Sequence, residues 1–164
     1  MEYREDDHFD FSMKGYKIFN MNFFREKPAD FCVGIEVATC FMEWQNHLLL
    51  LQYPESHLFA NRWAVPGGRI EKGESKESAL ERELFEELGL DHFDWNNIRW
   101  VQDAFVRRSI GDIRLHLFQW KLEKQPKVSL DLTEHLSYCW QRLDQLQQID
   151  LIDNQYDTYR IVYE

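Results

Sequence analysis

One helix with well-defined ends, set among strand-like segments, limits most strongly how this chain can fold. Ser75 is a good N-cap, and Gly89 fits the position just after the last helical residue. The apolar stripe of this helix consists of Ala79, Leu80, Leu84 and Leu88. An amphipathic helix flanked by strands must bury its stripe against a sheet, which predicts the α/β class.

Two strands are predicted before the helix. Residues 31–42 alternate apolar and polar positions and are rich in β-branched side chains. A turn at residues 44–46 leads into residues 47–53, whose continuous apolar run predicts burial on both faces. Residues 54–62 are predicted to form a loop. Residues 63–68 then read as a short extended segment that ends in a glycine turn.

The second half of the chain predicts two more strands and a helical end. Residues 98–107 and 113–122 are expected to pair as a hairpin. A short extended stretch is expected near residues 138–140, and residues 143–149 and 156–163 have helical spacing. We therefore expect a mixed central sheet that is covered on both faces.

The length of the chain predicts one domain. At 164 residues a single core can bury most of the apolar surface. Residues 1–29 have weak periodicity and mixed charge, so we interpret them as an N-terminal arm with one short strand around residues 16–24. No linker divides the remainder, and residues 30–164 are predicted to form one domain.

Charge and hydropathy narrow the range of partners. The chain has 19 Lys and Arg residues and 29 Asp and Glu residues, which gives a net charge of −10. We therefore do not expect it to bind a long nucleic acid. The longest apolar runs, such as Leu48 to Leu51, are far shorter than a membrane span, so no membrane partner is expected.

The cysteine pattern favours a cytoplasmic location. Cys32, Cys40 and Cys139 are odd in number, lie in apolar surroundings and lack CxxC spacing, which argues against a disulfide framework or a structural zinc site. The first residues are acidic and polar, and they show no pattern typical of a signal peptide.

A cluster of glutamates on the predicted helix indicates a functional site. Glu83 and Glu87 lie about 40° apart around the helix axis, and Glu83 and Glu86 about 60° apart. Two carboxylates about 5 Å apart near a protein surface repel each other by about 3 kcal/mol. Lys76 and Arg82 are too few to neutralise the acidic residues of this helix, so such a cluster in a cleft needs a further cation.

An all-oxygen donor set favours Mg²⁺, with Mn²⁺ as the alternative. Magnesium held by few protein ligands keeps water molecules and accepts substrate phosphate, so a phosphoryl substrate is the natural inference. A solvated acidic helix face is the other interpretation of a Glu-rich helix. Gly67 and Gly68 favour a site, because glycine lets the backbone approach a ligand closely.

This stretch resembles the signature of the Nudix hydrolase family, Gly-x5-Glu-x7-Arg-Glu-(aliphatic)-x-Glu-Glu-x-Gly-(aliphatic). Every specified position is filled at the required spacing. The matching residues are Gly68, Glu74, Arg82, Glu83, Leu84, Glu86, Glu87, Gly89 and Leu90. The resemblance implies a Nudix-type α/β/α sandwich with a mixed central sheet, and Mg²⁺-dependent hydrolysis of a nucleoside diphosphate linked to another group.

The resemblance also implies roles for individual residues. The metal ligands and catalytic groups would be Glu83, Glu86, Glu87 and, from a segment far downstream, Glu134. The carbonyl of Gly67 would be a further metal ligand. Arg82 would pair with Glu74 and hold the loop against the helix.

Several arginines are candidates for binding substrate. Arg62 and Arg69 flank the Pro-Gly-Gly turn and are predicted to contact the substrate. Arg107 and Arg108 end a strand, where they could meet phosphate or form a charge pair at the end of the hairpin.

The substrate stays open among three hypotheses. A (d)NTP or oxidised dNTP pyrophosphohydrolase is favoured by the segment before Pro66, although Gln52 and Tyr53 stand where such members often place arginines. A sugar-nucleotide hydrolase of the GDP-mannose type is suggested by the segment from Glu134 to Trp140. A binding module without catalysis is the third, and the complete glutamate motif argues against it. The partner is thus a small nucleoside diphosphate derivative, and a dimer is one open oligomeric state.

Overall fold

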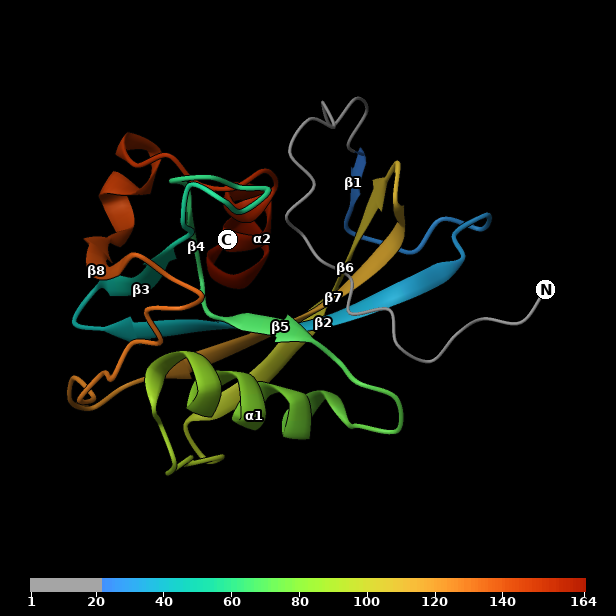
Figure 1. The fold of residues 1–164 in the computed structure, drawn as a ribbon. Helices are drawn as coiled ribbons and strands as arrows, with labels where there is room; N and C mark the ends of the chain where they lie inside the picture. The colour runs from blue at the N-terminus through green and yellow to red at the C-terminus, as the bar shows by residue number, and fades with distance from the viewer. Residues whose placement is uncertain (1–21) are drawn as a thin grey trace.

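The computed structural model describes residues 22–164, and its centre is an eight-stranded mixed sheet (Figure 1). The strands are β1 (Asn22–Phe24), β2 (Val33–Trp44), β3 (His47–Gln52), β4 (Trp63–Ala64), β5 (Gly67–Arg69), β6 (Ile98–Arg108), β7 (Gly111–Lys121) and β8 (Ser137–Arg142). The helical segments are α1 (Lys76–Leu88), the 3-10 helix η1 (Leu143–Gln148) and α2 (Gln155–Tyr163).

The central strand β2 organises the sheet. The strand order is β1-β6-β7-β2-β3-β4, with β5 paired to β2 and β8 paired to β3. Strands β2 and β7 run parallel, and the other pairs of named strands are antiparallel. Beside the turn, Glu43 and Trp44 of β2 pair with β3, whereas residues 37–39 pair with β5 on the same edge. As β2 and β3 diverge, the short strand β5 pairs with β2 in the space between them, next to α1 (Figure 1).

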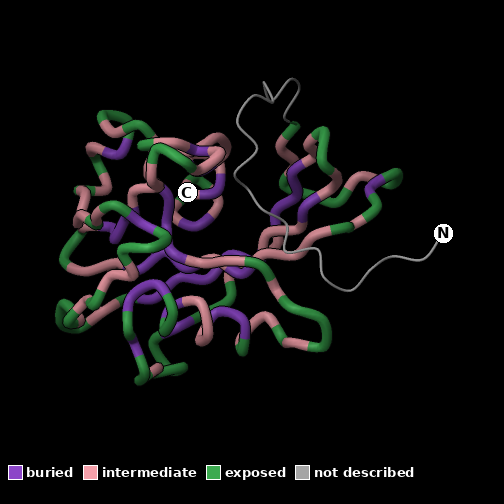
Figure 2. Tube along the Cα trace, viewed as in Figure 1, coloured by how far each residue is buried: buried purple, intermediate pink, exposed green. Residues whose placement is uncertain are grey.

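The two faces of the sheet bury different cores. Alternation along β2 points Ala38, Cys40 and Met42 toward the apolar stripe of α1. Phe41 points to the opposite face, where it joins a cluster with Leu146 of η1 and residues of α2. Figures 1 and 2 show α1 and α2 on opposite sides of the sheet, with the buried positions between them. The predicted α/β/α sandwich with a mixed sheet is confirmed.

The ends of the predicted central helix are also confirmed. The Ser75 hydroxyl accepts a hydrogen bond from the backbone N–H of Ser78 at 3.0 Å, and Gly89 adopts the left-handed conformation with φ of 68°. In β3, residues 48–51 are buried on both faces, as their continuous apolar run predicts.

Other boundaries differ from the predicted ones. Strand β2 runs to Trp44, so the turn shrinks to two residues, both with positive φ. The expected glycine turn at residues 67–68 is instead strand β5, because Gly67 packs directly on β2: a Cβ there would lie 2.2 Å from the Ala38 carbonyl oxygen. Residues 143–148 form a 3-10 helix.

The expected N-terminal arm is partly described. Residues 16–21 of its predicted strand lie outside the described residues, and residues 22–24 pair with β6 at one edge of the sheet. The boundary at residue 30 stays a prediction. Within residues 22–164 no helix is both long and apolar enough to cross a membrane. Cys32, Cys40 and Cys139 are free thiols.

Candidate metal centre

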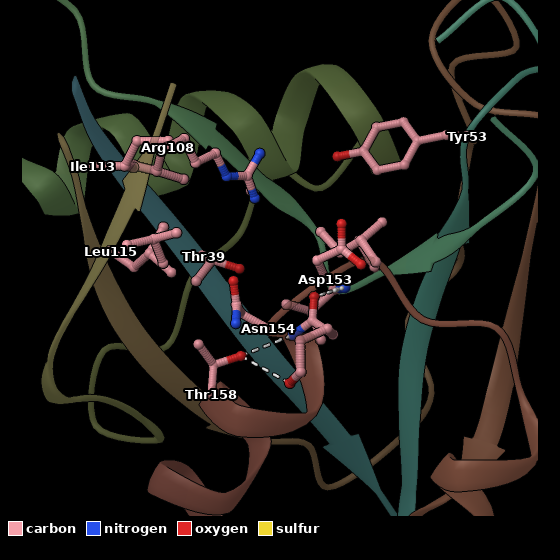
Figure 3. A pocket seen from close by; sticks show the side chains of 15 residues that line it. Thr39, Tyr53, Arg108, Ile113, Leu115, Asp153, Asn154 and Thr158 are labelled. Carbon is pink, nitrogen blue, oxygen red and sulfur yellow. Dashed lines mark hydrogen bonds between the residues drawn. The ribbon is translucent and has the colours of Figure 1, made fainter. Parts of the chain in front are cut away.

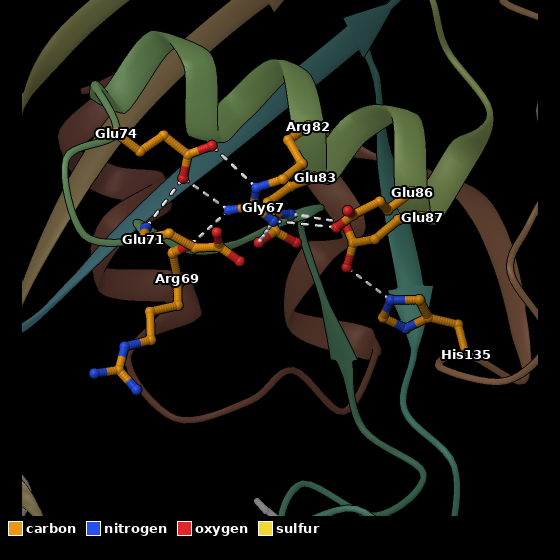
Figure 4. Close-up of polar contacts among 9 residues, drawn as sticks. All are labelled: Gly67, Arg69, Glu71, Glu74, Arg82, Glu83, Glu86, Glu87 and His135. Atoms are coloured by element: carbon orange, nitrogen blue, oxygen red, sulfur yellow. Dashed lines mark hydrogen bonds and ion pairs between the residues drawn. The ribbon is translucent and has the colours of Figure 1, made fainter. Parts of the chain in front are cut away.

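Arg82 stands at the centre of the acidic cluster on α1 (Figure 4). Its Nε and Nη2 donate to the two carboxylate oxygens of Glu74 at 3.0 and 2.9 Å, and Nη2 also donates to the carbonyl oxygen of Arg69 at 2.8 Å. Bidentate pairs of this kind are directional as well as strong. The predicted Arg82–Glu74 pair is confirmed, and it ties the loop between β5 and α1 to the helix.

The same guanidinium holds two of the predicted metal ligands. Arg82 Nη1 donates to Glu83 Oε1 at 2.7 Å and to Glu86 Oε2 at 3.1 Å. The side chain of Glu83 is 13% exposed, and that of Glu86 is 48% exposed. The Glu83 carboxylate lies against Gly68, where an added Cβ would come within 2.2 Å of it. Because glycine has no side chain, it leaves space at this position for the Glu83 carboxylate.

Glu87 is the most enclosed of the three carboxylates. It is buried, and its Oε2 accepts a hydrogen bond from the backbone N–H of Gly67 at 2.9 Å. Its Oε1 lies 2.7 Å from Nε2 of His135, which is also buried. Glu87 thus joins α1 to β5 and to the segment that leads into β8.

Backbone hydrogen bonds bring Glu134 to this place. The N–H groups of Ser129 and Asp131 donate to the carbonyl oxygens of Leu88 and Glu87 at the end of α1, at 2.8 and 3.0 Å. This anchors the segment, so that Glu87, Glu134 and His135 offer ligand atoms within 4.8 Å of one another. Glu134 is exposed at the outer side of the group.

His135 is the site residue that sequence reasoning did not assign. Its only signal in the sequence is its position next to Glu134, because its partner Glu87 lies far away along the chain. Nδ1 of His135 is buried and has no hydrogen-bond partner among residues 22–164. Since a carboxylate accepts, Nε2 carries the hydrogen in this contact.

Burial raises the pKa values of Glu83 and Glu87. Desolvation is the main cause that raises the pKa of Glu83 to about 7, opposed by the hydrogen bond from Arg82 and reinforced by the charge of Glu87. The pKa of Glu87 is raised by desolvation too, although the contacts with His135 and Gly67 oppose the rise. Carboxylates crowded in this way fit a hard divalent cation, which would favour their charged forms.

These shifts predict how the stability of metal-free protein depends on pH. The folded-state pKa of Glu83 is about 7, against an ordinary value of 4.5. Between these values the folded state binds the proton more tightly than the unfolded state. The free energy of unfolding should therefore fall as the pH rises from about 4.5 to 7, by at most about 3 kcal/mol, and then level off.

Denaturant unfolding in EDTA at pH 5, 6, 7 and 8 measures this effect. The Glu83→Gln variant should lack the decrease in the free energy of unfolding that Glu83 causes between pH 4.5 and about 7. Its stability relative to the parent protein should therefore improve as the pH rises. A stability difference between the two proteins that is constant with pH would contradict the shifted pKa.

The two arginines predicted to bind substrate have different surroundings. Arg62 donates to Asp150 and Asp153 at 3.3 and 2.9 Å and to the carbonyl oxygen of Leu151, so its donors hold the segment before α2. Its role in substrate binding stays a prediction. The side chain of Arg69 is exposed and points away from the glutamates in Figure 4.

A pocket of about 100 Å³ lies on the opposite face of the sheet, next to this cluster (Figure 3). Its floor is formed by β2, β6 and β7, and its wall by the start of α2. The polar side chains that line it belong to Thr39, Tyr53, Arg108, Asp153, Asn154, Gln155 and Thr158. Gly67 lines the pocket and also donates to Glu87, so the pocket and the carboxylates adjoin at β5.

Comparison with known proteins places this arrangement in one family. A family model described as NUDIX domain matches residues 34–161, which is most of the chain. The CTP pyrophosphohydrolase of Escherichia coli (strain K12) is 31% identical over 106 residues, covering 65% of this chain and 74% of that protein. The putative 8-oxo-dGTP diphosphatase 2 of Mycobacterium tuberculosis is 31% identical over 105 residues, covering 57% of this chain and 62% of that relative's length.

Solved structures share the fold. The MutT protein of Methanosarcina mazei Go1 superposes with a TM-score of 0.63 at 20% identity, over 78% of this chain and 92% of that one. The NUDIX domain of Shewanella oneidensis NrtR, solved with ADP ribose, gives a TM-score of 0.66 at 18% identity, over 84% of this chain and 92% of that one. At these identities the likeness concerns the fold.

Proposed function

Because this chain is a member of the Nudix hydrolase family, we propose that it is a Mg²⁺-dependent pyrophosphohydrolase of nucleoside diphosphate derivatives. The proposed substrate is a (d)NTP or an oxidised dNTP. One observation carries the proposal: Glu83 and Glu87 of α1 are packed against the backbone of β5, which also lines a pocket of about 100 Å³. Carboxylates and pocket are thus close enough to act on one molecule.

The residues present fit a magnesium site. The proposed ligands are Glu83, Glu86, Glu87 and Glu134, together with the carbonyl of Gly67, and Mn²⁺ is the alternative ion. Of these, Glu87 and Glu134 offer ligand atoms within 4.8 Å of each other and of His135. When bound, such an ion neutralises phosphate charge and lowers the pKa of an attacking water. The buried contact from His135 and the N–H of Gly67 would keep Glu87 in one orientation. One carboxylate of the cluster would accept the proton of the water.

The substrate class rests on the relatives and on the pocket. The names of two relatives refer to nucleoside triphosphates, CTP and 8-oxo-dGTP, which supports a triphosphate. We propose that the nucleoside enters the pocket beside α2 while the phosphates lie at the glutamates. Arg69, the exposed last residue of β5, is the proposed contact to the outer phosphates. We also propose that the protein is located in the cytoplasm and forms a dimer.

A hydrolysis panel tests the function. With Mg²⁺, release of pyrophosphate or phosphate would be measured over dNTPs, NTPs, 8-oxo-dGTP, GDP-sugars, ADP-ribose and dinucleoside polyphosphates. We expect turnover of one or more triphosphates, complete loss of it in EDTA, and recovery on adding Mg²⁺.

Two outcomes would overturn this assignment. Turnover of GDP-sugars alone would favour the sugar-nucleotide hydrolase. Absence of turnover on every substrate by folded, metal-loaded protein would favour a binding module.

A further inference from the structure

Two adjacent arginines at the end of β6 have opposite surroundings. Side chains alternate along a strand, so Val106 and Arg108 line the pocket while Arg107 points to the other face of the sheet. Arg107 is held by two ion pairs, with Asp112 at 2.8 Å and with Asp30 at 2.9 Å. Its charge is therefore balanced within the protein.

Arg108, in contrast, has no ion-pair partner among residues 22–164. Its guanidinium carbon lies 5.1 Å from the centre of the Phe59 ring, and Figure 3 shows the group directed into the pocket. Nε of Arg108 is buried without a hydrogen-bond partner, and among residues 22–164 no carboxylate forms an ion pair with it. Asp153, the acidic residue of the pocket, is paired with Arg62 at 2.9 Å.

An arginine in this state requires an explanation. Arg108 is half-buried, and removing a cation from water without an ion-pair partner costs free energy. Desolvation accordingly lowers the pKa of Arg108, although the charge of Asp153 opposes the shift. Stacking on Phe59 offsets only part of that cost. A guanidinium directed into a pocket and left without acceptors is suited to acceptors that a ligand brings.

The sheet register indicates which part of a nucleotide would reach Arg108. Arg108 pairs with Gly111 of β7, whereas Leu117 of β7 is level with Thr39 and Gly67 at the metal-site end of the pocket. Six residues of strand span about 20 Å. An arginine side chain, about 7 Å long, covers only part of this distance. With its phosphates at the glutamates, a substrate would bring its base, not its phosphates, toward Arg108.

We propose that Arg108 determines base specificity by donating two hydrogen bonds to a base edge that carries two adjacent acceptors. This inference rests on the proposed function. Guanine offers O6 and N7, and cytosine offers O2 and N3. Adenine places an amino group beside N7, and 8-oxoguanine carries a hydrogen on N7, so each offers the guanidinium a donor in place of an acceptor.

Steady-state kinetics of the Arg108→Ala and Arg108→Lys variants tests the proposal. We expect KM for dGTP and dCTP to rise about 5- to 150-fold in Arg108→Ala, with kcat and the KM for dATP and 8-oxo-dGTP little changed. Comparing dGTP with dCTP identifies which of the two bases is preferred. Arg108→Lys keeps the charge but not the planar fork, and it should lose most of the discrimination between bases.

Arg107→Ala is the matched control, since Arg107 is the neighbouring residue on the opposite face, and it should leave base preference unchanged. Melting curves verify that each variant is folded. An equal rise of KM for all four nucleotides would overturn base selection, as would unchanged kinetics in Arg108→Ala.

Direct binding separates this inference from the proposed function. Calorimetric titration of metal-free protein with GMP, CMP and AMP requires no turnover. If the protein hydrolyses nothing but binds GMP or CMP in a manner dependent on Arg108, the proposed function fails and the base preference stands. If the parent protein binds all three equally, or binds none, base selection by Arg108 is wrong.

Discussion

Replacing Glu87 by glutamine should lower kcat by about 100- to 1000-fold while leaving the protein folded. The glutamine side chain has the same shape, so its oxygen can still accept from the Gly67 N–H and its amide can donate to the other tautomer of His135. The negative charge that would hold a cation is lost. Because a buried charge beside other carboxylates is removed, we expect the free energy of unfolding to change by less than about 1 kcal/mol.

Initial rates at saturating Mg²⁺ and denaturant unfolding measure the two quantities separately. Glu81→Gln is the matched control: Glu81 is on the same helix, but its carboxylate accepts a hydrogen bond from Trp95 Nε1 at 2.7 Å, away from the cluster. Its rate should equal that of the parent protein. A Glu87→Gln variant with undiminished kcat would refute the ligand role of Glu87.

Replacing Arg82 by alanine should both destabilise the protein and inactivate it. The guanidinium makes charged hydrogen bonds with Glu74, Glu83 and Glu86 and holds the carbonyl of Arg69. Its loss leaves the half-buried Glu83 beside Glu87 without a counter-charge. We expect a loss of about 2–3 kcal/mol, or about 5–10 °C in melting temperature for a domain of this size.

Differential scanning calorimetry of metal-free protein measures the loss. Arg69→Ala serves as the control for stability, since its exposed side chain should contribute less than about 0.5 kcal/mol. Added Mg²⁺ should restore part of the stability of Arg82→Ala by replacing the missing positive charge. A melting temperature equal to that of the parent protein would show that the loop does not depend on Arg82.

The parts of this fold that were predicted from sequence are those with local causes. The helix begins at Ser75 and ends at Gly89 because capping depends on a few adjacent residues. The pairing of Arg82 with Glu74 is what the resemblance to the Nudix signature implied, and the structure contains it. Strand β5 differs from the predicted turn: glycine patterns are typical of turns, whereas the requirement for Gly67 comes from the backbone of β2, which lies too close for a side chain.

Hydrophobic periodicity and helical spacing act over a few residues, and for that reason the layers of the fold and the acidic edge of α1 are predictable from the amino-acid sequence. Three features are not: the approach of His135 to Glu87, the ion pairs of Arg62 with the segment before α2, and the lack of an ion pair at Arg108 in the described part of the chain. Each depends on which distant residues the sheet register and the loop packing bring within hydrogen-bond distance. Arg107 and Arg108 are neighbours in sequence, yet on the two faces of one strand the first is ion-paired and the second, within residues 22–164, is not.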